Sequence, residues 1–342
     1  MISLLSLERI LSALGSCRVG VYGDLFLDRY LEIDGGLDEP SIETGLTAYQ
    51  IVRVRSQPGA AGTVINNLHA LGVGSIEIFS MRGDDGEGYE LAQALGRMKG
   101  VGTEHLLVEP SRRTPTYTKP MYELPGASPR ELNRLDIKNR ERLPKTLETR
   151  LWEGLESSLE RLDALIVLDQ VSQIDCGVIT TNGISRLADL QARHPGKLIL
   201  ADSRERIGEF KAVTIKPNRD EVAKMLGLSS APSPEDISQT ISRLAKDRSQ
   251  SVFCTLSQDG ILHAHPGHSS VHASAPPVTG PIDVVGAGDS VSAALAAACA
   301  SGATIAEAMG LAMLVASVTI RQIGTTGIAP PDALRKAIHG IY

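Results

Sequence analysis

Short runs of β-branched and other apolar residues alternate along most of the chain with segments whose apolar residues follow a helical period. Helical patterns cover residues 63–71 and 87–98. The strand-like runs cover residues 18–23, 75–80, 164–169, 197–202, 212–217 and 251–256. Because parallel strands need a crossover connection, usually a helix, this alternation predicts an α/β fold with a mainly parallel sheet and helices on both faces.

Two segments interrupt the alternation, and both have the composition of antiparallel strands. Residues 31–58 are rich in Gly, Asp and Glu before the strand-like YQIVRV, and residues 116–136 combine TYTKPMYE with a turn of Pro and Gly. Neither segment is long enough to form a domain. We therefore expect a single domain over residues 1–342 with a small β lid built from these two segments.

The longest apolar stretches are predicted to be helices of a folded domain. Residues 1–18 carry Glu8 inside their apolar run, which is typical of an amphipathic first helix and not of a signal peptide. Polar residues and Gly302 interrupt residues 291–320, so two buried alanine-rich helices are expected there instead of a membrane span. The prolines of Pro232–Pro234 predict a turn that opens a further helix.

Charge and cysteine content narrow the classes of partner. The chain carries 34 Lys and Arg against 40 Asp and Glu, a net charge of −6. Such a chain, without a basic patch, has no general attraction for nucleic-acid phosphates or anionic lipids, so neither nucleic acid nor a membrane is an expected partner. The four cysteines have no C-x-x-C spacing, which is typical of reduced thiols. We expect a cytoplasmic protein that acts on a small molecule.

The segment with the most chemical information is IDVVGAGDSVSAALAAA, residues 282–298. A tight Gly286-Ala287-Gly288 turn leads directly into an alanine-rich helix, so free backbone N–H groups and the positive end of the helix meet at one place. Such a place binds anions. Asp289 lies in the first helical turn, where an acid either caps the helix or accepts a proton beside a bound phosphate.

DVVGAGDSVSAALA, residues 283–296, resembles the C-terminal signature of the PfkB, or ribokinase-like, carbohydrate kinases. The resemblance implies transfer of the γ-phosphate of Mg-ATP to a sugar hydroxyl, with Asp289 as general base. It also implies that the amides of Gly286, Ala287 and Gly288 form an anion hole for that phosphate. A monovalent cation, K⁺, is implied near Asp283 and Gly324.

Two further segments resemble the nucleotide site of this family. TIKPNRDEVAKMLG, residues 214–227, is similar to its P-N-x-x-E element, which implies that Asn218 lies near the triphosphate and that Glu221 holds Mg²⁺ through water. Taken alone, this string also fits a loop and a helix cap. CTLSQDGIL, residues 254–262, is similar to the nucleotide-site strand and turn. The remaining residues implied to contact ATP are Lys216, Thr255, Ser257, Gly260, Met313 and Ser317.

The N-terminal half resembles the substrate site of the same family. VGVYGDLFLDRY, residues 19–30, implies that Asp24 and Asp28 grip sugar hydroxyls, although an Asp pair can also cap a turn. PGAAGTVINNLHALG, residues 58–72, is similar to the glycine-rich substrate segment. The other residues implied to contact the sugar are Gly59, Ala60, Thr63, Lys119, Arg134 and Asp169.

Within the family the likeness is greatest to the heptose-7-phosphate kinase domain of ADP-heptose synthesis. The shared segments are GDLFLDRY, PTYTK at residues 115–119 and RLD at residues 134–136. We therefore expect conversion of heptose-7-phosphate to heptose 1,7-bisphosphate, with another sugar, a nucleoside, or catalytically weak sugar binding as alternatives. The bifunctional relatives continue into a nucleotidyltransferase domain, which is not expected within these 342 residues. Lids in this family often pair, and exposed edge strands favour pairing, so a homodimer through the lid is expected.

Four residues depart from the family pattern. Thr63 stands where an Asn usually contacts the substrate, and Ala60 replaces the second glycine of a Gly-Gly pair. Met121 replaces an Arg of the heptose-kinase pattern, and Met313 replaces an Asn near the adenine. Methionine cannot supply a charged contact to a phosphate, so these departures bear on which sugar is used.

A metal site and other nucleotide folds are the remaining alternatives. His263, His265, His268 and His272 have a spacing that zinc accepts, but their residues alternate around Pro266-Gly267 as in a β-hairpin, which we favour. The sequence contains no G-x-x-x-x-G-K-[ST], no G-x-G-x-x-G after a strand and no G-x-S-x-G.

Overall fold

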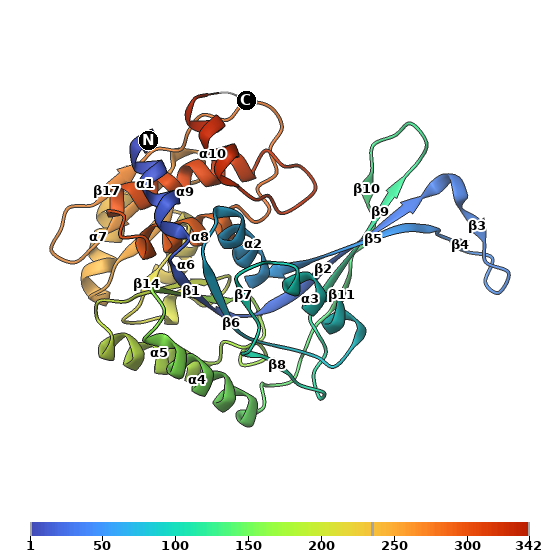
Figure 1. Ribbon diagram of the computed structural model, residues 1–342, viewed down its shortest axis with the longest axis horizontal. Helices are drawn as coiled ribbons and strands as arrows, with labels where there is room; N and C mark the ends of the chain where they lie inside the picture. The colour runs from blue at the N-terminus through green and yellow to red at the C-terminus, as the bar shows by residue number, and fades with distance from the viewer. Residues whose placement is uncertain (1, 234–235, 341–342) are drawn as a thin grey trace.

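The computed structural model describes residues 2–233 and 236–340, and its central feature is a ten-stranded sheet. The sheet has the order β17-β16-β15-β14-β13-β12-β1-β6-β7, and β8 pairs with β6. The pairs from β15 to β7, and β6–β8, are parallel, whereas β15, β16 and β17 are antiparallel. A mainly parallel sheet is therefore confirmed (Figure 1). Its strands are β1 (Arg18–Gly23), β6 (Ser75–Arg82), β7 (Val101–Gly102), β8 (Leu106–Val108), β12 (Ala164–Asp169), β13 (Leu198–Ser203), β14 (Thr214–Ile215), β15 (Val252–Thr255), β16 (Ile261–Ala264) and β17 (Val271–Ala273).

Helices cover both faces of this sheet, as the sequence predicts. Successive strand residues point to opposite faces, so Val21 joins one buried core and its neighbour Tyr22 the other. The first core contains side chains of α1 (Leu4–Leu14), α2 (Ala61–Leu71), α3 (Gly86–Gly96), α8 (Ala287–Ala300), α9 (Ile305–Thr319) and α10 (Pro331–Ile338). The second contains side chains of α4 (Lys145–Leu159), α5 (Thr181–Arg193), α6 (Arg219–Leu226) and α7 (Ile237–Arg248).

The two alanine-rich helices predicted at residues 291–320 are α8 and α9, which pack side by side in the first core. Small side chains let the backbones of α8 and α9 approach each other and the sheet, so almost every residue from Ser290 to Ala298 is buried. Across residues 2–233 and 236–340, no helix has both the length and the apolar character that a membrane crossing requires.

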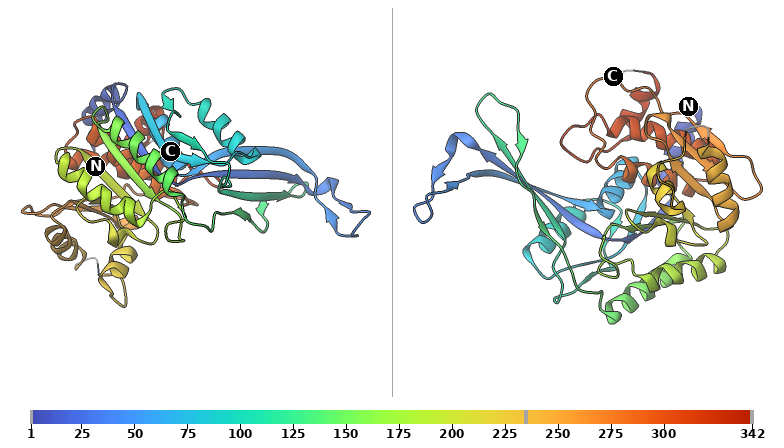
Figure 2. Two further views of the ribbon diagram at one scale, coloured as in Figure 1. Left: turned by 90° about the horizontal axis from the view of Figure 1, so that it is seen from below. Right: turned by 180° about the vertical axis from the view of Figure 1, so that it is seen from behind.

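A second sheet of five strands projects from one side of the α/β body (Figures 1 and 2). We call it the lid sheet, and its order is β10-β9-β2-β5 with β11 paired to β9. Its strands are β2 (Leu25–Asp34), β5 (Ile51–Ala60), β9 (Thr116–Glu123), β10 (Arg130–Glu131) and β11 (Leu135–Ile137), and β3 (Glu39–Pro40) pairs with β4 (Thr47–Ala48) beyond it. The short 3₁₀ helices are η1 (Gly35–Leu37), η2 (Ile207–Glu209) and η3 (Ser257–Asp259).

The lid sheet differs from the predicted one in two respects. It extends beyond residues 31–58, because β2 begins at Leu25, two residues after the end of β1, and β5 runs on to Ala60. It is also mixed: β2 and β5 are antiparallel, as expected, but β2 and β9 are parallel. The parallel pair is possible because β6, α3 and the connection that follows lie between β5 and β9 and reverse the chain direction.

Smaller differences concern the ends of elements. The strand predicted at residues 212–217 is only Thr214–Ile215, and the helix predicted at 63–71 begins at Ala61. Of the turn predicted at Pro232–Pro234, residue 234 lies outside the described residues, and α7 begins shortly afterwards at Ile237. The predicted first helix is α1, and the predicted hairpin is β16–β17.

Candidate active site

The carboxyl ends of the parallel strands carry a row of polar residues. Asp24 follows β1, Asp169 ends β12, Ser203 ends β13 and Lys216 follows β14. Parallel strands all end at one edge of a sheet, so these residues of distant sequence position become neighbours. The N-terminus of α8, with Asp289, lies at the same edge, because a Cβ on Gly288 would be 3.8 Å from Lys216 Nζ.

The glycine turn before α8 forms an open helix N-terminus. Gly286 has φ of 78° and no side chain caps the helix, so its first N–H groups face the cleft. A Cβ at Gly286 would lie 3.2 Å from Thr63 and 3.3 Å from Thr326, which together with the positive φ requires glycine here. The amide of Ala287 donates to the carbonyl of Val284 at 3.1 Å, so it is engaged within the turn. The amides of Gly286 and Gly288 have no recorded acceptor among the described residues.

Asp289 has the electrostatics of a base that works near neutral pH. Burial and the charge of Asp202 raise the pKa of Asp289 to about 7, although Lys216 and Arg204 act in the opposite direction. The charge of Asp28 on the lid sheet also contributes to the increase, so the two carboxylates are within electrostatic range of each other, and we call the region between them the common space. A carboxylate with a raised pKa accepts a hydroxyl proton more readily than an ordinary one.

Lys216 is held in the site by Asp202, which the sequence analysis did not identify. Its Nζ lies 2.9 Å from Asp202 Oδ2, and the hydroxyl of Ser292 donates to the same oxygen at 2.9 Å. Burial opposes the charge of Lys216, but Asp202, together with the charges of Glu221 and Asp289, outweighs burial and raises the pKa of the ammonium. A Cβ on Gly288 would lie 3.8 Å from Lys216 Nζ, so the ammonium and the anion-binding turn are adjacent.

A cleft of about 790 Å³ opens beside this turn and has the character of a nucleotide site. Most of the predicted ATP contacts line it: Asn218, Thr255, Ser257, Gly260, Ala287, Gly288, Met313 and Ser317. Lys216 and Glu221 lie outside its lining. The apolar wall of this cleft was not predicted, and its signal in the sequence is the proline-rich run after β17. This wall consists of Ala275, Pro276, Pro277, Val278, Ile282, Val284, Val291, Ala316 and Ile320.

Asn218 and Glu221 form a capping box at the start of α6, so this motif does cap a helix, as its sequence alone would suggest. The amide of Glu221 donates to Asn218 Oδ1 at 2.9 Å, and the amide of Asn218 donates to Glu221 Oε2 at 2.8 Å. Within residues 2–233 and 236–340, the other carboxylate oxygen of Glu221 has no recorded partner. Burial raises the pKa of Glu221, and the charge of Asp202 adds to this effect. A carboxylate with an open oxygen beside a second acid fits a divalent cation bound through water.

Asp28 lies on the lid sheet at the opposite side of the common space. Its Oδ2 is 3.4 Å from Lys119 Nζ, which also donates to the hydroxyl of Tyr30 at 3.2 Å. Burial raises the pKa of Asp28 despite Lys119. A Cβ at Gly59 would lie 2.8 Å from the Asp28 carboxyl carbon, so only glycine leaves the carboxylate in place. The predicted substrate residues Asp28, Gly59 and Lys119 are therefore in contact.

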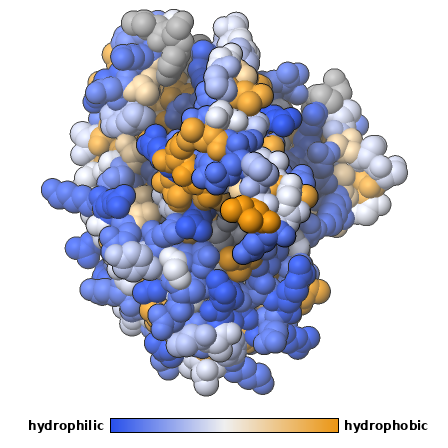
Figure 3. All heavy atoms as spheres, turned by 90° about the vertical axis from the view of Figure 1, so that its right-hand side faces the viewer, coloured by the Kyte–Doolittle hydropathy of each residue, from blue (hydrophilic) through white to orange (hydrophobic). Residues whose placement is uncertain are grey.

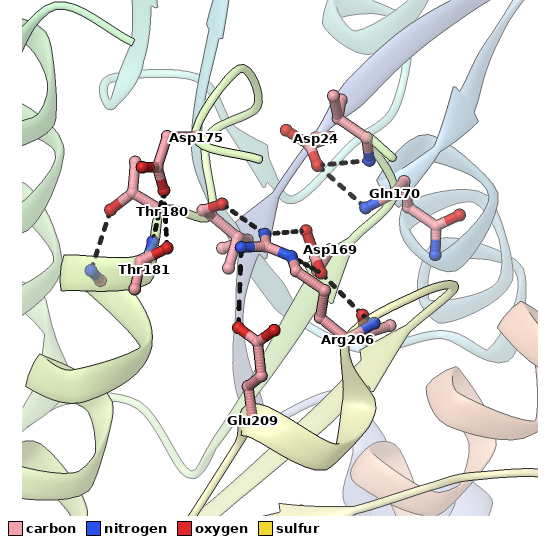
Figure 4. Close-up of polar contacts among 12 residues, drawn as sticks. Asp24, Asp169, Gln170, Asp175, Thr180, Thr181, Arg206 and Glu209 are labelled. Carbon is pink, nitrogen blue, oxygen red and sulfur yellow. Dashed lines mark hydrogen bonds and ion pairs between the residues drawn. The ribbon is translucent and has the colours of Figure 1, made fainter. Parts of the chain in front are cut away.

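Asp24 and Asp169, both predicted to contact the sugar, have other partners in the structure. Asp24 is 3% exposed, and its carboxylate accepts the backbone amides of Gln170 at 2.9 Å, Val171 at 3.2 Å and Val178 at 2.6 Å. Asp169 is 2% exposed and binds Arg206 at 2.7 Å and the hydroxyl of Ser203 at 2.6 Å (Figure 4). Both carboxylates therefore hold the loops after β12 and β13 in position.

Three further predicted substrate residues occupy distinct environments. Thr63 is only 2% exposed and packs under Gly286, so it supports the anion-binding turn. Arg134 lies 4.0 Å above the ring of Tyr117 and pairs with Asp136 at 2.6 Å. Ala60 has φ of 53°, a conformation that glycine adopts more easily.

Asp283 and Gly324, the residues predicted near a monovalent cation, are joined directly. The amide of Gly324 donates to Asp283 Oδ2 at 3.0 Å, and the amide of Val285 donates to Oδ1 at 3.0 Å. Each oxygen retains a lone pair, so the carboxylate can still ligate a cation. The histidines, by contrast, belong to the β16–β17 hairpin: His263 stacks near Phe253, and burial lowers the pKa of His263 to about 4. Within the described ranges, no three His, Cys, Asp or Glu side chains gather as a metal site.

Comparison with known proteins agrees with this geometry. The family described as pfkB family carbohydrate kinase matches residues 198–332, which contain the anion-binding turn and Asp289. The chain is 29% identical over 333 residues to the bifunctional protein HldE of Pelobacter propionicus, covering 96% of this chain and 65% of that protein. It is also 29% identical over 336 residues to HldE of Rhodospirillum rubrum, covering 98% of this chain and 64% of that protein. The chain thus spans slightly less than two thirds of the length of these relatives.

Solved structures share the fold at low sequence identity. A ribokinase from Arabidopsis thaliana complexed with ribose and ATP superposes with a TM-score of 0.68 at 17% identity, covering 94% of this chain and 98% of that chain. Phosphofructokinase-2 from Escherichia coli in complex with potassium gives a TM-score of 0.71 at 17% identity, covering 95% and 99%. The ribokinase-like α/β fold with a small second sheet is therefore confirmed. Residues 198–332, with the anion-binding turn and Asp289, are thus similar to the pfkB family of carbohydrate kinases.

Proposed function

We propose that this protein is an ATP-dependent sugar kinase that transfers the γ-phosphate to a hydroxyl of a sugar phosphate. The observation that carries the proposal is the position of Asp289. This carboxylate lies in the first turn of a helix with an open N-terminus, directly after Gly288 of the 790 Å³ cleft, and is within electrostatic range of Asp28 of the lid sheet. A proton acceptor between an anion-binding turn and a hydroxyl-binding carboxylate is what phosphoryl transfer to an alcohol requires.

Each part of the site has one task in this mechanism. The apolar wall and Met313 receive the adenine, and Thr255, Ser257 and Asn218 bind the polar part of the nucleotide. The amides of Gly286 and Gly288 bind the oxygens of the transferring phosphoryl group, where negative charge is present in the transition state. Asp28 and Lys119 orient the acceptor hydroxyl, and Asp289 takes its proton while the oxygen attacks phosphorus in line.

Two cations belong to this proposal. Mg²⁺ supplies charge neutralisation between the phosphates, and Glu221 would hold it through water with its unbonded oxygen while Asn218 lies beside the phosphates. K⁺ would lie against the Asp283 carboxylate, at the loop that also contains Gly324. We also propose a cytoplasmic location, where ATP is available and the four free cysteines stay reduced.

Heptose-7-phosphate is the proposed acceptor, with heptose 1,7-bisphosphate as product. The support is the likeness of GDLFLDRY, PTYTK and RLD to heptose-7-phosphate kinases, together with the contacts that Lys119 and Arg134 make at the acceptor side. The test is release of ADP from ATP with heptose-7-phosphate, fructose 1-phosphate, ribose and nucleosides, with Asp289→Asn as the inactive control. Turnover that is equal in wild type and Asp289→Asn, or sugar binding without ADP release, would refute the proposal.

We further propose that two copies of the chain pair through their lid sheets. One face of the lid and its tip expose apolar side chains, including Val52 at 59%, Val54 at 46% and Leu135 at 62%. Figure 3, which views the molecule from the lid side, has a concentration of apolar surface near its centre. Apolar residues gathered on an exposed sheet favour burial against a second copy. Sedimentation should give a dimer that Val54→Glu dissociates, whereas Leu5→Glu, at an exposed position of α1, leaves it intact. A monomeric wild type would rule this out.

A further inference from the structure

A side-chain hydrogen bond joins the lid sheet to the body of the molecule beside the anion-binding turn. The side-chain amide of Gln57, on β5, donates to the hydroxyl of Thr326 at 2.9 Å. Thr326 belongs to the loop of residues 324–327, which follows α9. The two partners are 269 positions apart in the chain. The bond therefore ties the lid to the C-terminal part of the fold.

Gln57 lies directly opposite Asp28 in the antiparallel pair of β2 and β5. Directly opposed side chains point to the same face of a sheet, with Cβ atoms about 4.5–5.5 Å apart. The face of the lid that presents Asp28 to the acceptor therefore also presents Gln57. The neighbouring pair, Arg29 and Ser56, points to the other face, where both side chains bind Glu90 of α3. The two faces of this strand pair are thus held by different parts of the body.

Thr326 also supports the backbone of the anion-binding turn. A Cβ on Gly286 would lie 3.3 Å from Thr326 Cγ2 and 3.2 Å from Thr63 Cγ2, so both threonines pack against this glycine. Thr63 lies in the first turn of α2, which follows β5 directly and packs against α8 (Figure 1). Both supports of the turn are therefore connected to β5, the lid strand that carries Gln57.

The ends of the loop of residues 324–327 are fixed as well. Asn67 of α2 is buried, and its side-chain amide donates to the carbonyl of Gly327 at 3.2 Å. At the other end, the amide of Gly324 donates to the carboxylate of Asp283, which lies just before the anion-binding turn. A loop bonded at both ends has little freedom to absorb a displacement at its centre. Movement of the lid therefore reaches the turn.

We propose that Gln57 is a positioning residue that couples binding of the acceptor on the lid sheet to the geometry of the anion-binding turn, through Thr326. This inference rests on the proposed kinase function. An acceptor bound to Asp28 fixes the lid strand, and the hydrogen bond of Gln57 then holds Thr326 against Gly286. The amides of the turn are thereby set for the transferring phosphoryl group when an acceptor is present. By linkage, a nucleotide whose terminal phosphate lies in the turn tightens acceptor binding by the same factor.

Two other roles for Gln57 fit the contacts less well. A residue that only contacted the acceptor would need no partner in the body, yet the amide of Gln57 donates to Thr326. A tether that only stabilises the lid is already provided by Glu90 on the other face. Neither role explains why the partner of Gln57 packs against Gly286.

The first test is a double-mutant cycle on kcat, with ATP and heptose-7-phosphate. Gln57→Ala removes the donor, and Thr326→Val removes the hydroxyl while keeping a methyl group to pack against Gly286. Each variant should lower kcat by about 3–10-fold, the effect of one hydrogen bond, with KM for ATP within about twofold of wild type. The double variant should be no slower than either single variant, because both changes break the same bond.

Gln50→Ala is the matched control, because Gln50 has the same side chain at the outer end of the lid and bonds Glu39 and Ala48 there. Its kcat should equal that of wild type. Thr326→Ser keeps the hydroxyl and should recover most of the rate lost in Thr326→Val. All of these variants should unfold within about 3 °C of wild type, since a single partly exposed hydrogen bond changes little of the total stability.

The second test measures the coupling itself by titration calorimetry, with a non-hydrolysable ATP analogue in the absence and presence of heptose-7-phosphate. In wild type the acceptor should tighten binding of the analogue by at least about fivefold, and the analogue should tighten the acceptor equally. In Gln57→Ala and Thr326→Val both factors should fall below about twofold, although each ligand alone binds as it does to wild type. Gln50→Ala should keep the full factor.

A third measurement needs no ligand. Amide hydrogen exchange of residues 283–288 and 324–327 should be at least about threefold faster in Gln57→Ala than in wild type, since the loop and the turn lose a support. In Gln50→Ala the exchange of both segments should be unchanged. Unchanged exchange in Gln57→Ala would overturn the inference.

The kinetic and binding outcomes separate this inference from the proposed function. An active wild type without coupling between analogue and acceptor overturns the inference alone, as does a Gln57→Ala variant that keeps the full coupling. Single effects that multiply in the double variant also overturn it. So does a variant in which only KM for the acceptor rises, since Gln57 would then contact the acceptor directly. If wild type phosphorylates no sugar, the kinase proposal fails and this inference fails with it.

Discussion

Replacing Asp289 with Asn should abolish turnover and at the same time stabilise the folded protein at alkaline pH. The amide keeps the shape of the side chain but cannot accept the hydroxyl proton, which should reduce kcat by about 10²–10⁴-fold. Binding of ATP should be retained, because the cleft lining does not change. The gain in stability follows from the pKa of Asp289, which rises from 3.8 to about 7 in the folded state.

A raised pKa means that the folded state opposes ionisation of Asp289. Protonated Asp289 therefore favours folding, and this contribution is fully present below the unfolded pKa of 3.8. It is lost as the pH rises toward the folded pKa of about 7. At about 1.36 kcal/mol per pKa unit, the full difference between the unfolded and folded pKa of Asp289 corresponds to about 4 kcal/mol. Asp289 is only partly buried, so screening by solvent reduces this to about 2 kcal/mol. Asn lacks the negative charge that is favourable at the N-terminus of α8, which reduces the expected gain in stability by about 0.5 kcal/mol.

We therefore expect Asp289→Asn to unfold at a temperature about 2–4 °C higher than wild type at pH 8. At pH 4 the two proteins should unfold at nearly the same temperature, because Asp289 is protonated in the folded state. The assay is thermal unfolding by circular dichroism at both pH values, with kcat measured on the same preparations. A variant that retains more than about a tenth of the wild-type rate would exclude Asp289 as the base. An equal stability gain at both pH values would refute the electrostatic explanation.

Three further predictions concern the neighbouring residues. The kcat/KM of wild type should rise with pH toward about 7, because Asp289 must be ionised to accept a proton, and a pH profile that is flat between 5 and 8 would contradict this. Lys216→Ala should lower the free energy of unfolding in urea by about 3–5 kcal/mol, since it leaves Asp202 buried without its cation. Lys224→Ala, at an exposed position of α6, serves as the control. Met121→Arg should raise kcat/KM for heptose-7-phosphate by about tenfold through a new charged contact. Thr63 is not changed in this variant, because it is buried and supports Gly286. A lower kcat/KM of Met121→Arg for heptose-7-phosphate would indicate a different natural acceptor.

Much of the candidate site could be predicted because its signals are local. The Gly286-Ala287-Gly288 turn and the alanine-rich helix are adjacent in sequence, and a helix N-terminus always presents free amides. The same holds for the capping box of Asn218 and Glu221 and for the strand that ends at Thr255. Met313 and Ser317 line the cleft, at positions where the resemblance implies contacts with ATP.

The partners of buried side chains could not be predicted in this way. Asp24 and Asp28 look alike in GDLFLDRY, yet Asp24 collects three backbone amides from residues 170–178, whereas Asp28 faces Lys119 and the common space. Likewise, Thr63 looked like a substrate contact but lies under Gly286. In each case the deciding contact comes from a segment more than 80 residues away in the chain.

The sequence by itself determined the order of strands and helices, the mainly parallel sheet and the chemistry of the turn before α8, because periodicity, glycine and capping residues act over a few neighbouring positions. Only the tertiary structure decided that β2 and β9 pair in parallel and that Asp202 holds Lys216. These features depend on which strand ends meet at one edge of the sheet. That juxtaposition arises when the whole domain packs, and no local pattern encodes it.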